Sequence, residues 1–240
     1  DCDDSSDCAE GLYCDQNLNN SFVIINGVWK NQASHLLSFH NPCLTERELS
    51  DANTIGFKKD FSGLLNICFV GRAGNNKGAA VLLEALSSFK KINIFNEVNF
   101  IGLEEKDIAI NSFSLGTARI KYNGWISRSQ LDKIYAKSHL IILPTKSEGF
   151  PKVIAEASAF GCIPIVTNIE PINQIVINRK NGILLDAPKV ENIKKLFLNL
   201  EKKDYDLKVI SNEAISMSKL FTYNRYLDRI KSEIIDANIK

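Results

Sequence analysis

From Leu64 onward the chain alternates short apolar runs with longer amphipathic stretches, and this pattern limits its possible folds more than any other feature. The apolar runs have four to seven residues, the length of a buried strand, and the stretches between them have ten or more, enough for a helix. Strands that alternate with helices are typical of β-α units around a parallel sheet. The predicted fold class is therefore α/β, a Rossmann-like doubly wound parallel sheet, whose ligands lie at the carboxyl ends of the strands.

The individual elements follow from the same pattern. Strands are predicted at Leu65–Val70, Val98–Ile101, Arg119–Tyr122, Leu140–Leu143, Ile163–Val166 and Gly182–Leu185. Helices are predicted at Gly78–Lys91, Ser129–Lys137, Pro151–Phe160, Pro171–Ile177, Val190–Leu200 and over most of Tyr205–Ile239. A further strand and a turn are expected within residues 21–29.

Composition and charge exclude several functional classes. With 45% hydrophobic and 24% charged residues the chain is an ordinary globular protein, and no apolar run approaches the roughly 18 to 20 residues of a membrane-spanning helix. Residues 1–20 carry six acids and no base, so the other 220 residues hold 29 bases against 22 acids. This excess suits an anionic small molecule or a peripheral contact with an acidic membrane surface, but not nucleic-acid binding. The acidic start lacks the pattern of a secretory leader. We therefore expect a cytoplasmic protein, with a location at the inner face of the membrane as one option.

Six cysteines fall into two groups. Cys68 and Cys162 lie inside apolar runs, where each is expected to be a small buried hydrophobic residue. The others are Cys2, Cys8, Cys14 and Cys43. A metal site or a disulfide is conceivable among them, but their spacing lacks the paired C-x2-C form of a zinc knuckle, and no metal site is predicted.

The first candidate motif is the loop Gly71–Gly78, directly after the first strand of the regular pattern. It is similar to a Walker A loop, but Asn76 stands where the second glycine belongs and Gly78 where a serine or threonine would bind magnesium. A helix follows at once, and its first N–H groups favour an anion. Arg72 and Lys77 together are suited to hold a diphosphate. The alternative is a solvated turn with two ordinary surface cations.

The second candidate motif, Lys146–Pro151, leads into a helix that contains Glu156. Glu156 is the only charge in the run 153–160, and a buried carboxylate costs several kcal/mol unless hydrogen-bond donors satisfy it. The two vicinal hydroxyls of a ribose are such donors, and Glu148, nearer the mouth of the site, would likewise contact sugar hydroxyls. Gly149 allows close backbone approach beside it. The alternative is that Glu156 pairs with a lysine or arginine inside the fold.

Taken together, the motifs resemble the donor-binding half of the retaining glycosyltransferases of family 4, which have the two-domain GT-B architecture. The resemblance runs from about Leu64 to Ile230, and its elements arrive in the family's order. They are Gly71-Arg72 with Lys77-Gly78, Tyr122–Ile126, Ile142–Thr145, Glu148–Pro151 with Glu156, Gly161–Val166, Asn181-Gly182, and a closing helical segment around Phe221-Thr222. Seven motifs in register make the resemblance specific.

The resemblance implies a role for each matched side chain. Arg72 and Lys77, in the loop that starts at Gly71, correspond to the cations that neutralise the diphosphate of the sugar donor. Glu148 corresponds to the carboxylate that contacts the transferred sugar, and Glu156 to the carboxylate on the nucleotide ribose. Glu148, Arg72 and Lys77 are accordingly the expected catalytic residues.

The family also implies backbone contacts and a reaction type. The backbone around Gly149, Phe150 and Pro151 corresponds to the helix start that cradles the phosphates, and Ile126 lies where the family's backbone meets the base. Such enzymes retain the anomeric configuration and need no metal or other cofactor. They take a nucleoside-diphosphate sugar as substrate and hold the acceptor in a second domain across the cleft.

Two features depart from the family pattern. Glu170-Pro171 and Gln174 stand where the family often has a Gly-Gly pair and a glutamate, and only some 60 residues precede the match, where the acceptor domain would lie. We therefore expect residues 1–60 to be a partial acceptor-side segment and hinge, 61–221 the donor-binding domain, and 222–240 a C-terminal helix that packs back towards the N-terminal part.

Three functional hypotheses remain open at this point. The first is a glycosyltransferase that moves a sugar, with retention, from a nucleoside-diphosphate sugar to a glycan, a lipid or another acceptor. The alternative is a non-catalytic nucleotide-sugar-binding module, or a fragment or subunit that needs an acceptor domain in cis or in trans. The third is a metal-dependent transferase with Asp-x-Asp, a spacing found at Asp1–Asp3 and Asp204–Asp206, but neither follows a nucleotide-binding strand.

Overall fold

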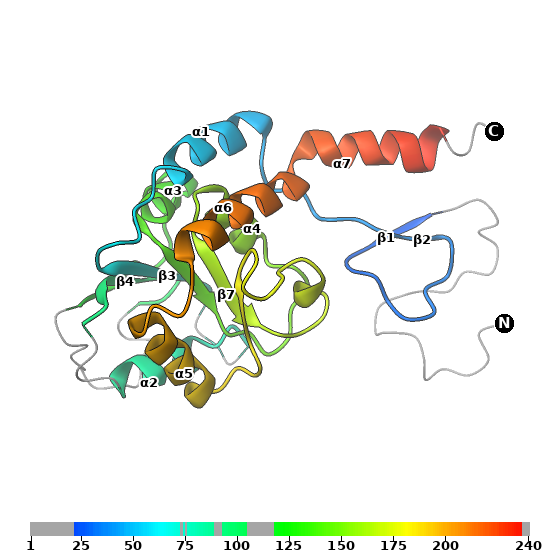
Figure 1. The fold of residues 1–240 in the computed structure, drawn as a ribbon. Helices are drawn as coiled ribbons and strands as arrows, with labels where there is room; N and C mark the ends of the chain where they lie inside the picture. The colour runs from blue at the N-terminus through cyan, green and yellow to red at the C-terminus, as the bar shows by residue number, and fades with distance from the viewer. Residues whose placement is uncertain (1–21, 73, 75, 89–92, 105–117, 237–240) are drawn as a thin grey trace.

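One six-stranded parallel sheet forms the centre of the molecule (Figure 1). The computed structural model describes residues 22–72, 74, 76–88, 93–104 and 118–236. The strands of this sheet are β3 (Leu65–Val70), β4 (Phe95–Ile101), β5 (Arg119–Tyr122), β6 (Leu140–Leu143), β7 (Ile163–Thr167) and β8 (Ile183–Leu185). All six overlap the strands predicted from the apolar runs, so the predicted Rossmann-like α/β class is confirmed.

The strand order of the sheet, β5-β4-β3-β6-β7-β8, contains one reversal. From β3 the chain runs outward to β4 and β5, then returns to place β6 on the other side of β3 and continues outward again. The registers Ile67↔Leu140 and Cys68↔Ile141 fix β3 against β6. In open sheets of this kind, ligands bind outside the carboxyl ends of the strands where the order reverses. The β3–β6 junction is therefore the place where a site is expected.

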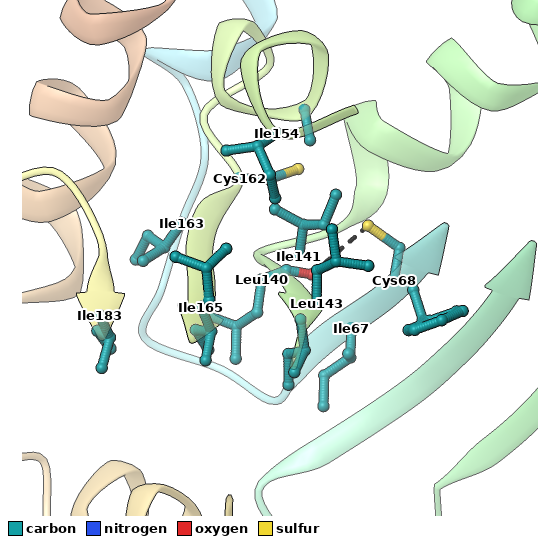
Figure 2. Close-up of a cluster of buried hydrophobic side chains, with 14 of the residues drawn as sticks. Ile67, Cys68, Leu140, Ile141, Leu143, Ile154, Cys162, Ile163, Ile165 and Ile183 are labelled. Carbon is teal, nitrogen blue, oxygen red and sulfur yellow. Dashed lines mark hydrogen bonds between the residues drawn. The ribbon is translucent and has the colours of Figure 1, made fainter. Parts of the chain in front are cut away.

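Helices cover both faces of this sheet. The helices α1 (Glu46–Gly56), α3 (Arg128–Lys137), α4 (Lys152–Ala159) and α6 (Leu207–Ser218) lie on one face, and α2 (Ala79–Ser87) and α5 (Val190–Glu201) lie on the other (Figure 1). Every residue of β6 and β7 is buried, because both faces of these central strands are covered. Figure 2 shows the aliphatic side chains of β3, β6 and β7 packed together, with Cys68 Sγ 3.6 Å from the Leu140 carbonyl oxygen.

A buried lysine ties the end of α3 to the core. Lys59 is 9% exposed, and its ammonium donates hydrogen bonds to the carbonyl oxygens of Tyr135, at 2.8 Å, and Ser138. These carbonyls belong to the C-terminal end of the helix, where a cation is favoured. The same ammonium lies 3.2 Å from Cys162 Sγ. Burial alone would raise the pKa of Cys162, but a hydrogen bond from Cys68 and the Lys59 charge lower it to about 7.

The N-terminal part contains elements that the sequence pattern did not predict. The strand expected within residues 21–29 is β1 (Val23–Ile25), and it pairs in parallel with an unpredicted β2 (Leu36–Ser38). Helix α1 was also missed, although its start carries a sequence signal. Thr45 and Glu48 form a capping box, in which each side chain accepts a hydrogen bond from the other residue's backbone N–H.

The helix predicted at Pro171–Ile177 is wrong in extent, because only the 3-10 turn η2 (Ile172–Gln174) forms. The side chain of Asn181 explains where it stops. Its Oδ1 accepts from Ile177 N at 2.7 Å and its Nδ2 donates to the Ile175 carbonyl oxygen at 3.0 Å. A side chain that takes these backbone groups competes with the helical hydrogen bonds.

The long helix predicted over Tyr205–Ile239 is also divided. After α6 come a 3-10 turn η3 (Lys219–Phe221), helix α7 (Tyr223–Ile230) and a π turn η4 (Lys231–Ile235). The break falls at Thr222, whose backbone is extended and whose hydroxyl caps α7 by accepting from Arg225 N at 3.3 Å. Because an N-cap residue has a non-helical backbone, Thr222 also interrupts the helical segment that precedes it.

Two chain connections run side by side between the sheet and the outlying β1, β2 and α7. The N–H groups of Cys43 and Leu44 both donate to the Phe221 carbonyl oxygen, at 2.9 and 3.2 Å. The Tyr223 N–H donates in return to the Leu44 carbonyl oxygen at 3.0 Å. The outgoing and returning chains are therefore bonded to each other where they cross.

Helix α7 contacts the β1–β2 segment through Tyr226, whose ring lies edge-on to Phe39 with centroids 5.6 Å apart, and through Arg229. Arg229 donates to the Ser38 carbonyl oxygen at 2.9 Å, and its guanidinium lies 4.0 Å from the ring centroid of Phe39. Figure 1 shows α7 and the β1–β2 pair on the same side of the molecule. Among the described helices, none has the length and apolar character needed to cross a bilayer.

Candidate functional site

The two motif loops meet at the reversal of the strand order. The Asn76 carbonyl oxygen, in the loop after β3, accepts from Thr145 Oγ1 and from Lys146 N, both at 2.8 Å, in the loop after β6. Gly78 has a positive φ of 80°, and a Cβ there would lie 2.1 Å from the Pro144 carbonyl oxygen. Only glycine allows this approach. The loops are thus locked together over the carboxyl ends of β3 and β6.

Across this junction Lys77 and Glu148 form an ion pair through Glu148 Oε1. Their side chains are 34% and 21% exposed. The second carboxylate oxygen, Glu148 Oε2, is covered and has no hydrogen-bond partner among the residues that the structure describes. An acceptor left without a partner costs free energy until a hydrogen-bond donor reaches it. The structure therefore brings together a predicted phosphate cation and the predicted sugar carboxylate, and leaves one oxygen available to a hydroxyl.

Two helices begin at this junction without a side-chain cap. Helix α2 starts at Gly78 and α4 starts after Pro151, and among the described residues no side-chain cap binds the first N–H groups of either. The helices α1, α3, α6 and α7 do have such caps, which are Thr45, Ser127, Asp206 and Thr222, whereas α5 also lacks one. Unpaired N–H groups and the positive end of the helix dipole favour an anion. Pro151, predicted as the first helical residue, occupies the N-cap one position earlier.

The other predicted cation, Arg72, lies directly after β3, in the same loop as Lys77. Its guanidinium is over the ring of Trp125, 5.1 Å from the centroid. Gly71 N donates to the Ile101 carbonyl oxygen at 3.0 Å, which joins the loop after β3 to the end of β4. Ile126, expected to meet the base through its backbone, has its side chain packed against the core.

Glu156 has the internal partner that the sequence left open as an alternative. It is 8% exposed, its Oε1 lies 2.6 Å from a guanidinium nitrogen of Arg128, and its Oε2 lies 3.5 Å from the Tyr135 hydroxyl. Burial raises the pKa of Glu156, and the Arg128 charge opposes that rise. Arg128 also bonds Asp132 at 3.0 Å. A ribose at this carboxylate would have to share it with Arg128.

Phe150 connects the second motif to the crossing chains. Its ring stacks on Phe221 with centroids 4.5 Å apart and an interplanar angle of 17°. The imidazole of His40 lies on Phe221 as well, at 5.3 Å. Burial and the nearby charges of Arg229 and Arg225 lower the pKa of His40. Three rings thus join the motif loop to both connections.

The β1 segment also reaches the loops of the site, at a residue where the chain departs from the family pattern. Gln174 accepts from Val28 N and donates to the Val28 carbonyl oxygen, both at 2.8 Å. A Cβ on Gly149 would lie 3.6 Å from Asn26 Nδ2, and a Cβ on Gly27 would lie 2.5 Å from Pro171. No pattern in the sequence indicates these contacts, which join residues between 123 and 146 positions apart.

Other candidates from the sequence either lie outside the described residues or are placed away from this junction. The leader cysteines and Asp1–Asp3 lie outside the described residues, and Cys43 is buried with a free thiol. His139 accepts a hydrogen bond from Asn66 N at 2.8 Å. The described ranges contain no group of three or more metal-binding side chains. A groove of about 730 Å³ lies at the amino ends of β3 and β4, opposite the edge where ligands bind in such sheets.

Comparison with known proteins extends the likeness over most of the chain. The family model described as "Glycosyl transferases group 1" matches residues 54–217. The D-inositol 3-phosphate glycosyltransferase of Rhodococcus jostii is 27% identical over 172 residues, which are 68% of this chain and 38% of that protein. The chain spans between 30% and 44% of the length of the curated relatives it matches.

Solved structures share the fold. The glycosyltransferase from Rickettsia africae superposes with a TM-score of 0.60 at 23% identity, over 83% of this chain and 57% of that one. Anabaena HepE in complex with UDP gives a TM-score of 0.63 at 16% identity, over 85% and 58%. At these identities the likeness concerns the fold alone.

Proposed function

Because this chain belongs to the group 1 glycosyl transferases, with their GT-B fold, we propose that it binds a nucleoside-diphosphate sugar at the β3–β6 junction. Family membership supports glycosyl transfer in general. Our finer proposal is that the sugar moves with retention, as in family 4, to a glycan, a lipid-linked or another acceptor. The observation that carries the proposed sugar-donor site is the Lys77–Glu148 pair, which places a cation and a carboxylate from the two motif loops next to each other.

The diphosphate would bind to the positive groups of this junction. Lys77 and Arg72 offer two cations, and the first N–H groups of α2 and α4 offer backbone donors. These groups are positioned before the ligand arrives, so they stabilise charge that develops on the leaving diphosphate at little reorganisation cost. We accordingly propose a reaction that needs no metal ion, with phosphate charge neutralised by the protein.

The sugar and the ribose would each meet a carboxylate. When the diphosphate takes Lys77, Glu148 becomes free to accept hydroxyls of the transferred sugar, through Oε2 first. Glu156 remains our candidate for the ribose hydroxyls, in competition with Arg128. The backbone around Gly149 and Ile126 would complete the contacts to phosphate and base.

The domain that binds the acceptor would lie mostly outside the described part of the chain. We propose that residues 61–221 are the donor-binding domain, that 1–60 belong to the acceptor side and hinge, and that 222–240 pack back on that side, as Arg229 does on Ser38. The contact of Gln174 with Val28 supports an acceptor side that lies next to the sugar. The alternative is a binding module that depends on a partner for catalysis, and in both cases we place it in the cytoplasm, with peripheral membrane contact for a lipid-linked acceptor.

Calorimetric titration tests the sugar-donor site directly. UDP, GDP and ADP are titrated into the chain in the presence of EDTA, and melting temperatures are recorded alongside. UDP comes first because the Anabaena neighbour was solved with it. We expect one of the three to bind and to raise the melting temperature without metal. Absence of heat and of thermal stabilisation with all three at millimolar concentration would refute the proposal.

A further inference from the structure

Trp125 is an exposed indole at the edge of the candidate site. It is 75% exposed, a larger fraction than any other large apolar side chain in the described part of the chain. Tryptophan has the largest apolar surface of any side chain and is usually mostly buried. An indole left in water beside a ligand site therefore calls for a functional explanation.

The backbone around Trp125 keeps the ring at this place. Gly124 has a positive φ of 47°, its N–H donates to the Leu103 carbonyl oxygen at 2.9 Å, and its own carbonyl oxygen accepts from Gly102 N. The next residue, Ile126, packs against the core and anchors the loop from the other side. The indole is therefore held at the carboxyl edge of the sheet by fixed neighbours.

Arg72 lies over the face of this ring. The guanidinium carbon is 5.1 Å from the ring centroid, within the range of a cation–π interaction. The approach of the two loops is fixed at Gly102, which has a positive φ of 82° and where a Cβ would lie 2.7 Å from the Gly71 carbonyl oxygen. The ends of β3, β4 and β5 are thereby joined under the Arg72–Trp125 pair.

We infer that Trp125 is a positioning residue, which holds the Arg72 guanidinium where the diphosphate of the sugar donor binds. The inference rests on the proposed function, in which Arg72 neutralises phosphate charge. A free arginine side chain loses much rotamer freedom when it binds an anion, and a ring that already restricts it lowers this cost. The indole would thus raise affinity without itself touching the diphosphate.

A double-mutant cycle tests this role with the nucleoside diphosphate that binds most tightly among UDP, GDP and ADP. Trp125→Leu keeps an apolar side chain but removes the ring, and we expect it to weaken binding about two- to five-fold. Trp125→Phe should restore most of the affinity, because it keeps an aromatic face. In an Arg72→Gln background, Trp125→Leu should cause no further loss, since no guanidinium remains to be held.

Two controls separate this role from simpler ones. Arg179 lies over Tyr205 at 4.6 Å in a similar pair far from the motif loops, and Arg179→Gln should leave nucleotide affinity unchanged. The matching nucleoside, which lacks phosphates, should bind equally well to the wild type and to Trp125→Leu. A loss on the nucleoside as large as on the diphosphate would mean that Trp125 contacts the base, and would overturn the inference.

The other outcomes of these titrations distinguish a failure of the positioning role from a failure of the proposed function. Equal losses from Trp125→Leu with and without Arg72, or no loss at all while the wild type binds, would overturn the positioning role and leave the sugar-donor site intact. A wild type that binds none of the three nucleoside diphosphates would instead refute the proposed function itself. The two failures are therefore distinguishable in one set of titrations.

Discussion

Lys77 and Glu148 are 71 positions apart in the chain, yet their charged groups pair across the β3–β6 junction. The pair joins the two loops that carry the candidate motifs, and it neutralises one positive and one negative group at the same spot. A ligand with both a phosphate and hydroxyls would replace this pair by one partner for each charge. The two residues should therefore respond differently to nucleotides with and without a sugar.

The first prediction concerns these two charges. Lys77→Gln should weaken nucleoside-diphosphate binding by about 1.5 to 3 kcal/mol, or roughly 10- to 150-fold, because a charged hydrogen bond to phosphate is lost. Glu148→Gln should leave that binding unchanged or tighter, since it frees Lys77, but should weaken the intact sugar donor. Titrations of both variants with nucleoside diphosphate and with sugar donor make the measurement. Equal weakening of both ligands by Glu148→Gln would contradict the assignment.

The second prediction separates the two roles open to Glu156. Glu156→Gln should lower the free energy of unfolding by about 1 to 3 kcal/mol, because Arg128 loses a buried partner. In Arg128→Met/Glu156→Gln no unpaired guanidinium remains, so the melting temperature should recover. If Glu156 also binds the ribose, nucleotide affinity should stay low in this double variant. Recovery of both stability and affinity would show that the carboxylate serves Arg128 alone.

A third prediction is a loss of stability in acid that depends on His139. Burial, then the Lys59 charge, lowers the pKa of His139 from 6.5 to about 4. The folded state therefore keeps a neutral imidazole while the unfolded state takes up a proton, and stability falls as the pH drops from about 6.5 towards 4. The loss amounts to about 3 kcal/mol at most.

Urea unfolding between pH 7.5 and 4.5 measures this effect. His139→Gln keeps an acceptor for the Asn66 N–H and should flatten the pH dependence. His40, whose pKa is also lowered, contributes part of the remaining slope. The exposed His35 offers a matched control, and His35→Gln should follow the wild type. A slope for His139→Gln as steep as that of the wild type would disprove the assignment.

The fourth prediction concerns the buried Lys59. Lys59→Met keeps the apolar stem but leaves the carbonyls of Tyr135 and Ser138 without their donor, and should cost about 1 to 3 kcal/mol of stability. Lys208 also donates to two backbone carbonyls, those of Phe57 and Lys59, but in a more exposed position. Lys208→Met should therefore cost less. Thermal and urea unfolding compare the variants, and equal losses would show that burial of the ammonium is unimportant.

The central strands β6 and β7 could be predicted because burial on both faces gives continuous apolar runs in the sequence, as at Leu140–Leu143. The edge strand β5 was also predicted, although none of its residues is fully buried. Helix α1 was not predicted because its buried face contains only Leu49, Ala52 and Gly56. The Thr45–Glu48 capping box at its start could nevertheless have been recognised in the sequence. Strand β2 has only two apolar residues, Leu36 and Leu37, whereas the equally short β1 lies in the longer apolar run Phe22–Ile25. Short elements are decided by their neighbours, which the local sequence does not contain.

The candidate site divides in the same way. The positions of Arg72, Lys77 and Glu148 after strands follow from chain order, and the reversal between β3 and β6 brings their loops together. The interaction partners of the site side chains, in contrast, cannot be predicted from chain order. The pairs of Glu156 with Arg128 and of Arg72 with Trp125 depend on how α3 and the loop before it pack, and no spacing in the sequence encodes that.

The bonded crossing of the two connections has a mechanical consequence. Two separate single chains would let the outlying segments twist and slide independently of each other. Leu44 and Phe221 are each hydrogen-bonded to the opposite chain. The two connections therefore form one double-stranded link, which resists twisting more than a single chain would. Phe150 stacks on Phe221 of this crossing, so a movement of the crossing would also displace the motif loop. Such coupling acts in both directions with equal free energy.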